Sequence, residues 1–226
     1  MKKIPRKKTS KAKILIVDDH PVVRKGLAYL IDKEPDLRVC GECAEGGGLL
    51  SHVARLKPDA IVLDLFLKDS SGISLLKDLR KAFPKLPVLV LSMQDESIYT
   101  ERVLRAGGRG YVSKDDMLEN VVGALRQILQ GNVYAGEAVK NKLLKNISSA
   151  ATSTDESILS RLGDRELEVF QLLGQGHSTR RIAERWGRSI KTVETYRAHL
   201  KRKLNLADSS ELVHRAIQWM QKREKS

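Results

Sequence analysis

The chain has 226 residues, of which 41% are hydrophobic and 31% are charged, so it can bury a core and is not compositionally disordered. No apolar run reaches the roughly 20 residues that a membrane-spanning helix needs, and two cysteines are too few for a disulfide-built secreted fold. The net charge of +13 is uneven: residues 1–13 hold seven bases and no acid, and residues 188–203 hold six bases against one acid. A basic stripe of this kind indicates nucleic-acid binding.

The N-terminus combines basic residues with the four apolar residues 14–17. This run is too short for the apolar segment of a signal peptide, and no small-residue cleavage site follows it. We therefore expect a basic tail, residues 1–12, ahead of a first buried strand in a cytoplasmic protein.

From residue 14 to about residue 130, short apolar runs alternate with stretches of helical period. The predicted strands are residues 14–17, 37–44, 60–65, 87–93 and 110–113, and the predicted helices are residues 21–31, 49–56, 73–83, 98–106 and 117–129. Strands joined by helical crossovers must be parallel. The pattern predicts an α/β fold, a doubly wound five-stranded parallel sheet of flavodoxin-like type.

No further strand is predicted after residue 131, and the rest of the chain reads as helical. Residues 136–147 have the pattern of one helix, and residues 148–155 are small and polar, as in a linker. Four more helices are predicted at residues 164–173, 179–186, 190–204 and 209–219, with cap residues at Asp164, Ser178 or Thr179, Ser189, and Asp208 or Ser209. The expected division is a sheet domain at 13–131, a linker with one helix at 132–157, and an all-α four-helix domain at 158–226.

Polar side chains follow four of the predicted strands. They are Asp18 and Asp19, then Asp64, Ser92 and Lys114. Because parallel strands end at one edge of a sheet, these side chains should share a crevice there. Three carboxylates so close repel one another, and a divalent cation with oxygen ligands removes that cost. The sequence therefore predicts a Mg²⁺ site.

The same cluster suits phosphoryl transfer to the protein itself. Asp64 can attack a phosphoryl group as a carboxylate nucleophile, while Lys114 and the metal neutralise the phosphoryl oxygens. Ser92 can donate a hydrogen bond to one of those oxygens. The glycines at 46–48 lack the lysine of a P-loop, and no general base is placed for a substrate. These residues predict a protein that accepts a phosphoryl group, not an enzyme.

With Tyr111 added, this set of strand-end residues resembles the receiver domain of two-component response regulators over residues 13–131. The resemblance implies that a sensor histidine kinase phosphorylates Asp64. It also implies that Asp18, Asp19, Asp64 and the backbone carbonyl of Phe66 hold Mg²⁺.

The resemblance assigns further roles near the phosphoacceptor. Ser92 and Tyr111 form the switch, in which the hydroxyl moves onto the phosphoryl group and the ring follows inward. Gly72 occupies the position of the family's loop glycine. Leu67-Lys68 replaces the family's Met-Pro, which predicts a less rigid loop. Asp115 replaces a frequent cis-proline, so the chain needs either a non-proline cis bond, costing ~3 kcal/mol, or a different path.

Two other features invite a functional reading that the residues do not favour. His20 is interpreted as a loop residue beside the acidic pair, in preference to a ligand role. Cys40 and Cys43 have CxxC spacing, but on a strand they point to opposite faces, and two thiols are too few for a structural zinc site.

The predicted helix at residues 190–204 has one apolar face and one face of small, polar and basic side chains. Such a helix can lie in the major groove, with its bases on phosphates and its small side chains on base edges. A short helix and a Gly-Arg-Ser turn precede it, as in a helix-turn-helix.

Residues 162–206 resemble the LuxR-type module of NarL/FixJ-type regulators. The matching residues are Arg165 to Val169, Gly176-His177-Ser178, Ile182-Ala183, Trp186-Gly187, Ser189 to Thr195 and Lys203-Leu204-Asn205. Tyr196 departs from a commoner histidine. The resemblance places Glu194, Thr195 and Ala198 on base edges. It places Lys191, Thr192, Arg197, Lys201 and Arg202 on phosphates.

The combined reading is a response regulator transcription factor that binds double-stranded promoter DNA and forms a homodimer on activation. The resemblance implies that the last helix supplies a dimer contact through Leu212, Val213, Ala216 and Ile217, and it admits RNA polymerase as a further partner. Two alternatives stay open. One is an aspartyl-phosphate hydrolase of haloacid-dehalogenase type, although Phe66 stands where that class needs a second acid. The other is a receiver that works unphosphorylated.

Overall fold

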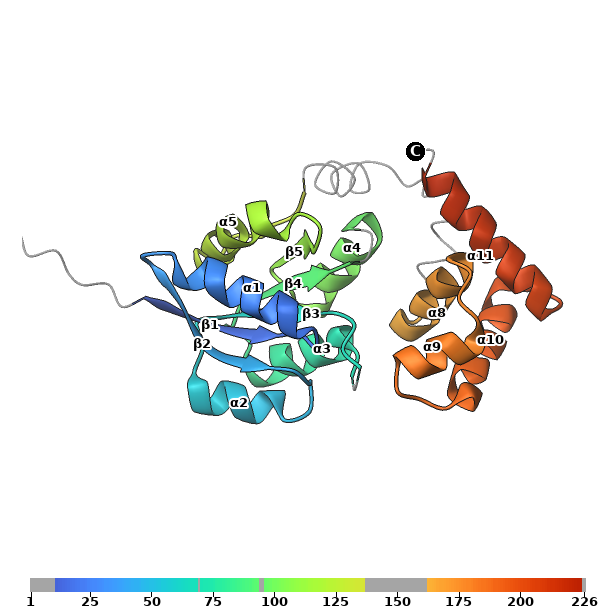
Figure 1. Ribbon diagram of the computed structural model, residues 1–226, viewed down its shortest axis with the longest axis horizontal. Helices are drawn as coiled ribbons and strands as arrows, with labels where there is room; N and C mark the ends of the chain where they lie inside the picture. Colours follow the sequence, from blue (N-terminus) through green and yellow to red (C-terminus); the bar gives the residue numbers. More distant parts are fainter. Residues whose placement is uncertain (1–10, 69, 94–95, 137–161, 225–226) are drawn as a thin grey trace, which may run out of the picture. The chain divides into compact units, whose positions relative to one another are not determined.

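The computed structural model describes residues 11–68, 70–93, 96–136 and 162–224 (Figure 1). The chain divides into two compact units, residues 1–143 and 144–226. The linker at 148–155 and nearly all of the helix predicted at 136–147 lie outside the described residues. Within the described ranges, no helix is both long enough and apolar enough to cross a membrane.

The first unit is a five-stranded parallel sheet with the strand order β2-β1-β3-β4-β5. Its strands are β1 (Ala12–Val17), β2 (Leu37–Cys43), β3 (Ala60–Asp64), β4 (Val88–Ser92) and β5 (Gly110–Ser113). Its helices are α1 (Pro21–Asp32), α2 (Leu49–Leu56), α3 (Gly72–Ala82), α4 (Glu96–Ala106) and α5 (Met117–Leu129). The predicted α/β fold class is confirmed.

Both faces of the sheet are covered, which explains why the strands are apolar throughout rather than alternating. Helices α1 and α5 lie on one face, where their apolar stripes pack on alternate strand residues, among them Ile14, Val62 and Leu91. The residues between these point to the other face, on the side of α2 and α3 in Figure 1. This double cover leaves the strand ends as the place where polar groups can gather.

The register of the sheet brings the strand ends level. Val17 of β1 pairs with Leu63 of β3, and Asp64 pairs with Leu91 of β4. Ser92 in turn pairs with Ser113 of β5. The residues that follow these positions therefore lie at one edge, as the sequence predicts.

The second unit is helical, with α8 (Asp164–Gly174), α9 (Thr179–Arg185), α10 (Ile190–Leu204) and α11 (Ser209–Glu224). Ser178 and Ser189 cap α9 and α10, accepting hydrogen bonds from Arg181 N and Thr192 N at 3.2 Å. The cap predicted at Asp164 is wrong. Gly163 is the cap residue, and the Glu166 carboxylate accepts its N–H at 2.7 Å, so no side-chain cap is needed.

Gly72 begins α3 where the chain passes close to the end of β3. A Cβ atom at this position would lie 2.5 Å from Leu65 Cα and 2.6 Å from the Asp64 carbonyl oxygen. Both obstructing atoms belong to the backbone, so they cannot move aside as the end of a side chain could. Only glycine fits between the end of β3 and the start of α3.

We predict that Gly72→Ala lowers the free energy of unfolding by about 1–3 kcal/mol, because the added methyl group overlaps backbone. The control is Gly123→Ala in α5, where a Cβ meets nothing within 4 Å. That change should raise stability by about 0.5–1 kcal/mol, since alanine is the better helix former. Urea unfolding followed by circular dichroism measures both, and equal midpoints for the two variants would contradict the prediction.

Candidate functional site: an acidic pocket and a helix-turn-helix

The carboxyl edge of the sheet holds a pocket built from three strand ends. Asp18 follows β1, Asp64 ends β3 and Lys114 follows β5. Lys114 Nζ lies 2.7 Å from Asp18 Oδ2 and 2.8 Å from Asp64 Oδ2. All three side chains are almost completely buried. The structure therefore brings together the predicted phosphoacceptor, an acidic partner and the lysine.

Burial sets the electrostatics of the pocket. It raises the pKa of Asp64, and the neighbouring Asp18 carboxylate adds to that rise, while Lys114 and the Phe66 N–H oppose it. Burial alone would lower the pKa of Lys114, but the Asp64 and Asp18 carboxylates outweigh it and raise that pKa. The raised pKa of Lys114 keeps the ammonium group charged. The raised pKa of Asp64 shows that this one ammonium group does not offset the burial of the carboxylates.

The second acid of the pair, Asp19, shows where that charge is missing. Its side chain is 7% exposed, and its Oδ1 atom forms an ion-pair contact with His20 Nδ1 at the edge of the pocket. Asp18, Asp19, His20 and Asp64 each place a ligand atom within 4.8 Å of the others. Buried carboxylate oxygens in such a group suit a divalent cation. The residues present therefore fit a metal ion.

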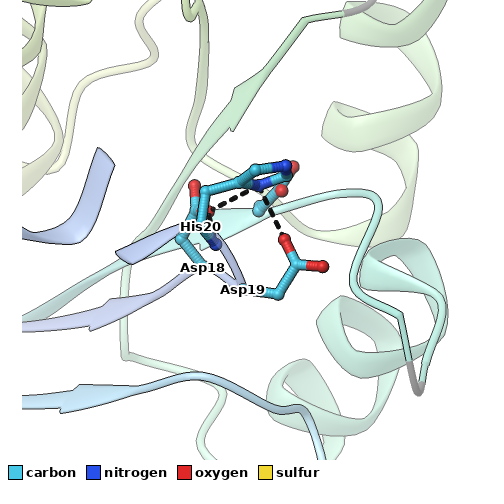
Figure 2. Close-up of side chains that lie close together, drawn as sticks. Asp18, Asp19 and His20 are labelled. Carbon is cyan, nitrogen blue, oxygen red and sulfur yellow. Dashed lines mark hydrogen bonds and ion pairs between the residues drawn. The ribbon is translucent and has the colours of Figure 1, made fainter. Parts of the chain in front are cut away.

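Two exposed side chains, those of His20 and Lys68, lie at the mouth of this pocket. His20 Nδ1 is 2.7 Å from Asp19 Oδ1 and 3.2 Å from Asp18 Oδ1 (Figure 2). Lys68 Nζ is 4.0 Å from Asp19 Oδ2. Sequence reasoning gave neither residue a role, although the position of His20 directly after the acidic pair was a usable signal.

The predicted switch residues lie on β4, which neighbours β3, and on β5, which neighbours β4. Ser92 ends β4, next to the end of β3, and Tyr111 lies in β5. Both side chains are fully buried. The Lys114 backbone N–H donates to the Ser92 carbonyl oxygen at 2.9 Å, which connects the lysine to the serine.

In the second unit, α10 presents the predicted DNA-contacting face. Val193 and Leu200 are buried against the unit. On the opposite side, five of the predicted contact residues are exposed, and these are Lys191, Glu194, Thr195, Ala198 and Arg202. The remaining three, Thr192, Arg197 and Lys201, are half-buried.

Two of the half-buried residues, Arg197 and Thr192, have side-chain partners within the unit. The Arg197 guanidinium donates to Thr179 Oγ1 of α9, and the Thr192 hydroxyl lies 2.9 Å from Ser189 Oγ. Tyr196 packs edge-on against Trp186, with ring centroids 5.9 Å apart. The Arg197 and Tyr196 contacts fix α10 against α9 and its C-cap residue, so the exposed face is presented at a defined angle.

Two family models match the chain. The response regulator receiver domain covers residues 14–126, and the luxR family of bacterial regulatory proteins covers residues 160–216. Oxygen regulatory protein NreC of Staphylococcus carnosus is 34% identical over 212 residues, which are 91% of this chain and 96% of that protein. The chain belongs to the two-component response regulators. Its two matched parts are a receiver domain and a LuxR-type DNA-binding domain, in the arrangement of the NarL/FixJ type.

Solved structures of response regulators support the same assignment. RcsB from Salmonella enterica serovar Typhimurium, bound to promoter rprA with a phosphomimetic, has a TM-score of 0.60 and 27% identity, covering 91% of this chain and 98% of that one. A LuxR-family regulator from Aurantimonas sp. SI85-9A1 has a TM-score of 0.57 and 29% identity, covering 62% of this chain and 100% of that one.

The structure describes both departures from the receiver pattern, Leu67-Lys68 and Asp115. Leu67 is 1% exposed and packs into the core, while Lys68 reaches towards Asp19. No peptide bond in the described ranges is cis, so the bond before Asp115 is trans. The chain therefore follows a different backbone path here and does not use the non-proline cis bond that the sequence left open.

The thiols of the receiver domain are both free. Burial raises the pKa of Cys40 and of Cys43, which disfavours the reactive thiolate form. Cys43 Sγ lies 3.5 Å from His52 Nδ1 on α2.

In the DNA-binding domain, Glu168 is a buried acid that joins α8 to the start of the turn. Its carboxylate accepts from Arg165 Nη1 and from Trp186 Nε1, both at 2.7 Å. Burial is the largest effect on its pKa and raises it, although Arg165 and Trp186 oppose the rise. Sequence reasoning matched these residues to the LuxR pattern without finding the network.

We predict that the wild type loses stability relative to Glu168→Gln as the pH rises from about 4.5, the ordinary pKa of glutamic acid, towards neutrality. The sign follows because the folded domain binds this proton more tightly than the unfolded chain does. Unfolding free energies of both proteins across this range test it. Glu184→Gln, on the exposed side of α9, controls for the charge change. A difference that does not vary with pH would contradict the prediction.

Proposed function

We propose that Asp64 is the phosphoacceptor of this response regulator and that a sensor histidine kinase is its phosphodonor. The observation that carries the proposal is the shared contact of Lys114 Nζ with Asp64 and Asp18 at 2.8 and 2.7 Å. A buried nucleophilic carboxylate beside a fixed positive charge can accept a phosphoryl group, because Lys114 is already placed to neutralise the incoming oxygens.

We assign Mg²⁺ to the carboxylates of Asp18, Asp19 and Asp64 and to the backbone carbonyl of Phe66. When bound, the ion supplies positive charge beside the phosphoryl oxygens. The Phe66 N–H donates to Asp64 Oδ1 at 3.2 Å and so orients the carboxylate. The Ser92 hydroxyl then donates to a phosphoryl oxygen, and Tyr111 completes the switch. Nothing in this set activates water or a substrate, so we infer that the protein is not an enzyme.

Asp64 should be the only residue that is phosphorylated. We predict that the wild type incubated with acetyl phosphate and Mg²⁺ gains the mass of one phosphoryl group, and that Asp64→Asn gains none, because an amide is not a nucleophile here. Asp78→Asn, which changes an exposed side chain of α3, is the control and should behave as wild type. Rapid phosphodonor turnover without a stable mass gain would favour a hydrolase. No gain in any protein would favour a receiver that works unphosphorylated.

For the DNA-binding domain we propose that α10 enters the major groove of promoter DNA. Glu194, Thr195 and Ala198 then face base edges. Lys191, Thr192, Arg197, Lys201 and Arg202 face phosphates. RcsB, the structural relative, is described as bound to promoter DNA and as dimers on DNA. A regulator that binds the bacterial chromosome works in the cytoplasm, and we propose that location.

We also propose that the protein acts as a homodimer, with one correction to the expected contact on α11. Leu212 and Ala216 are completely buried against their own domain, and the Ala216 carbonyl oxygen would lie 2.7 Å from a Cβ at Gly174 of α8. These two residues are therefore unavailable, and the prediction that they contact a partner is wrong. Val213 and Ile217 are only half-buried and stay candidates for that contact.

The proposed boundaries are a basic tail at 1–12, the receiver domain at 13–131, a linker at 132–157 and the DNA-binding domain at 158–226. The division of the chain between residues 143 and 144 supports a linker in this region. The Tyr134 N–H donates to the Arg109 carbonyl oxygen at 2.8 Å, so the start of this linker still lies against β5.

Loss of a single phosphate contact should change how strongly DNA affinity depends on salt concentration. We predict that Lys191→Ala weakens binding to all sequences alike and lowers the slope of log affinity against log salt by about 1, because one phosphate contact is lost. The control is Lys81→Ala, an exposed base of the receiver domain, which should leave the slope unchanged. Affinity measured by fluorescence anisotropy at several salt concentrations tests both. An unaltered slope for Lys191→Ala would count against the helix assignment.

A further inference from the structure

The chain that leaves α5 turns back onto β5 before it enters the linker. The Tyr134 N–H donates to the Arg109 carbonyl oxygen at 2.8 Å, and the Tyr134 carbonyl oxygen accepts from Tyr111 N at 3.2 Å. Tyr134 thereby forms a parallel bridge with Gly110. Because β5 is an edge strand of the sheet, these bonds satisfy backbone groups that the sheet itself does not pair. We call residues 134–136 the strap.

The far end of the strap is attached to α4. The Gly136 N–H donates to Glu96 Oε1 at 2.7 Å, and Glu96 is the first residue of α4. The fit is close, since a Cβ atom at Gly136 would lie 2.8 Å from both carboxylate oxygens. The buried Thr100 hydroxyl donates to the Glu96 carbonyl oxygen at 2.7 Å, and Ala135 in the middle of the strap is buried. The strap therefore joins β5 to α4 within three residues.

Both of these elements are also connected to the acidic pocket. β5 contains Tyr111 and is followed by Lys114. α4 contains Tyr99, which is buried and whose ring meets the Phe66 ring edge-on, with the ring centroids 5.5 Å apart. The Phe66 N–H in turn donates to the Asp64 carboxylate at 3.2 Å. A change at Asp64 can therefore reach the strap through two sets of packed contacts, one on each side.

We propose that the strap, attached to α4 by Glu96, passes the state of the pocket to the interdomain linker. A three-residue segment that is bonded to two elements keeps both attachments only while those elements keep their relative position. The switch of the proposed function moves Tyr111 inward and so displaces β5 relative to α4. Tyr134 follows β5, to which two backbone hydrogen bonds hold it, whereas the single hydrogen bond between Gly136 and Glu96 breaks. The proposal rests on the phosphoacceptor site of the proposed function, and it makes Glu96 a positioning residue for the linker.

The attachment is tested by the hydrogen exchange rate of the Gly136 amide, measured by nuclear magnetic resonance in the full-length chain. We expect exchange about tenfold faster in Glu96→Ala, because the charged acceptor of this N–H is lost. Glu96→Gln keeps an oxygen acceptor and should stay nearer to the wild type. The matched control is Glu101→Ala, another acid of α4, which pairs with Arg105 and should exchange as the wild type does. Equal rates in the wild type and Glu96→Ala would overturn the proposal.

The coupling is tested by adding beryllium fluoride and MgCl₂, which together imitate a phosphoryl group on a carboxylate. We expect Gly136 exchange to rise severalfold in the wild type and to stay unchanged in Asp64→Asn. If the amide signals of Ser92 and Lys114 shift while Gly136 exchange stays the same, the coupling is wrong and the proposed function is unaffected. If the signals of the pocket do not shift either, the proposed function itself is wrong and the coupling fails with it.

Discussion

The contact of one buried ammonium group with two buried carboxylates organises the functional edge of the receiver domain. Lys114 follows β5, whereas Asp18 follows β1 and Asp64 ends β3, so the contact draws together strand ends that the sheet order separates by β4. Opposite charges attract strongly where water is excluded, but an acid left without a partner there is costly. One lysine among three acids leaves that cost partly uncompensated. The deficit makes the pocket receptive to a cation.

The DNA-binding domain contains buried acids too, but it satisfies them internally. Glu168 is held by Arg165 and Trp186, and Glu166 accepts from the Gly163 N–H and from Lys203 Nζ at 2.6 Å. Although burial opposes the shift, the Lys203 ammonium and the Gly163 N–H hold the pKa of Glu166 below its ordinary value. A closed network of this kind fixes geometry instead of inviting a ligand. Buried carboxylates thus leave a charge deficit in one domain and form a structural joint in the other.

The sequence predicted the strands, the helices and the pocket because each depends on local pattern. Apolar runs bounded by turn residues define buried strands, and parallel pairing then dictates which residues share an edge. The predictions that were wrong depend on tertiary packing. Leu212 and Ala216 belong to an apolar stripe that could equally face a partner or α8, and periodicity alone cannot distinguish these surfaces. Gly163 acts as a cap only because Glu166 folds back onto it, and the ring position of His20 depends on a backbone turn.

The hydrogen bond between Lys114 and Ser92 provides a route by which a phosphoryl group in the pocket would change the structure outside it. In the proposed function, a phosphoryl group on Asp64 brings about two negative charges, which compete with Asp18 for the Lys114 ammonium group. A movement of the Lys114 backbone would also move Ser92, because the Lys114 N–H donates a hydrogen bond to the Ser92 carbonyl oxygen at 2.9 Å. Ser92 and Tyr111 are fully buried, and close-packed interiors transmit displacement instead of absorbing it. We therefore expect the proposed signal to leave the pocket through β4 and β5, the two strands whose ends adjoin Asp64 and Lys114.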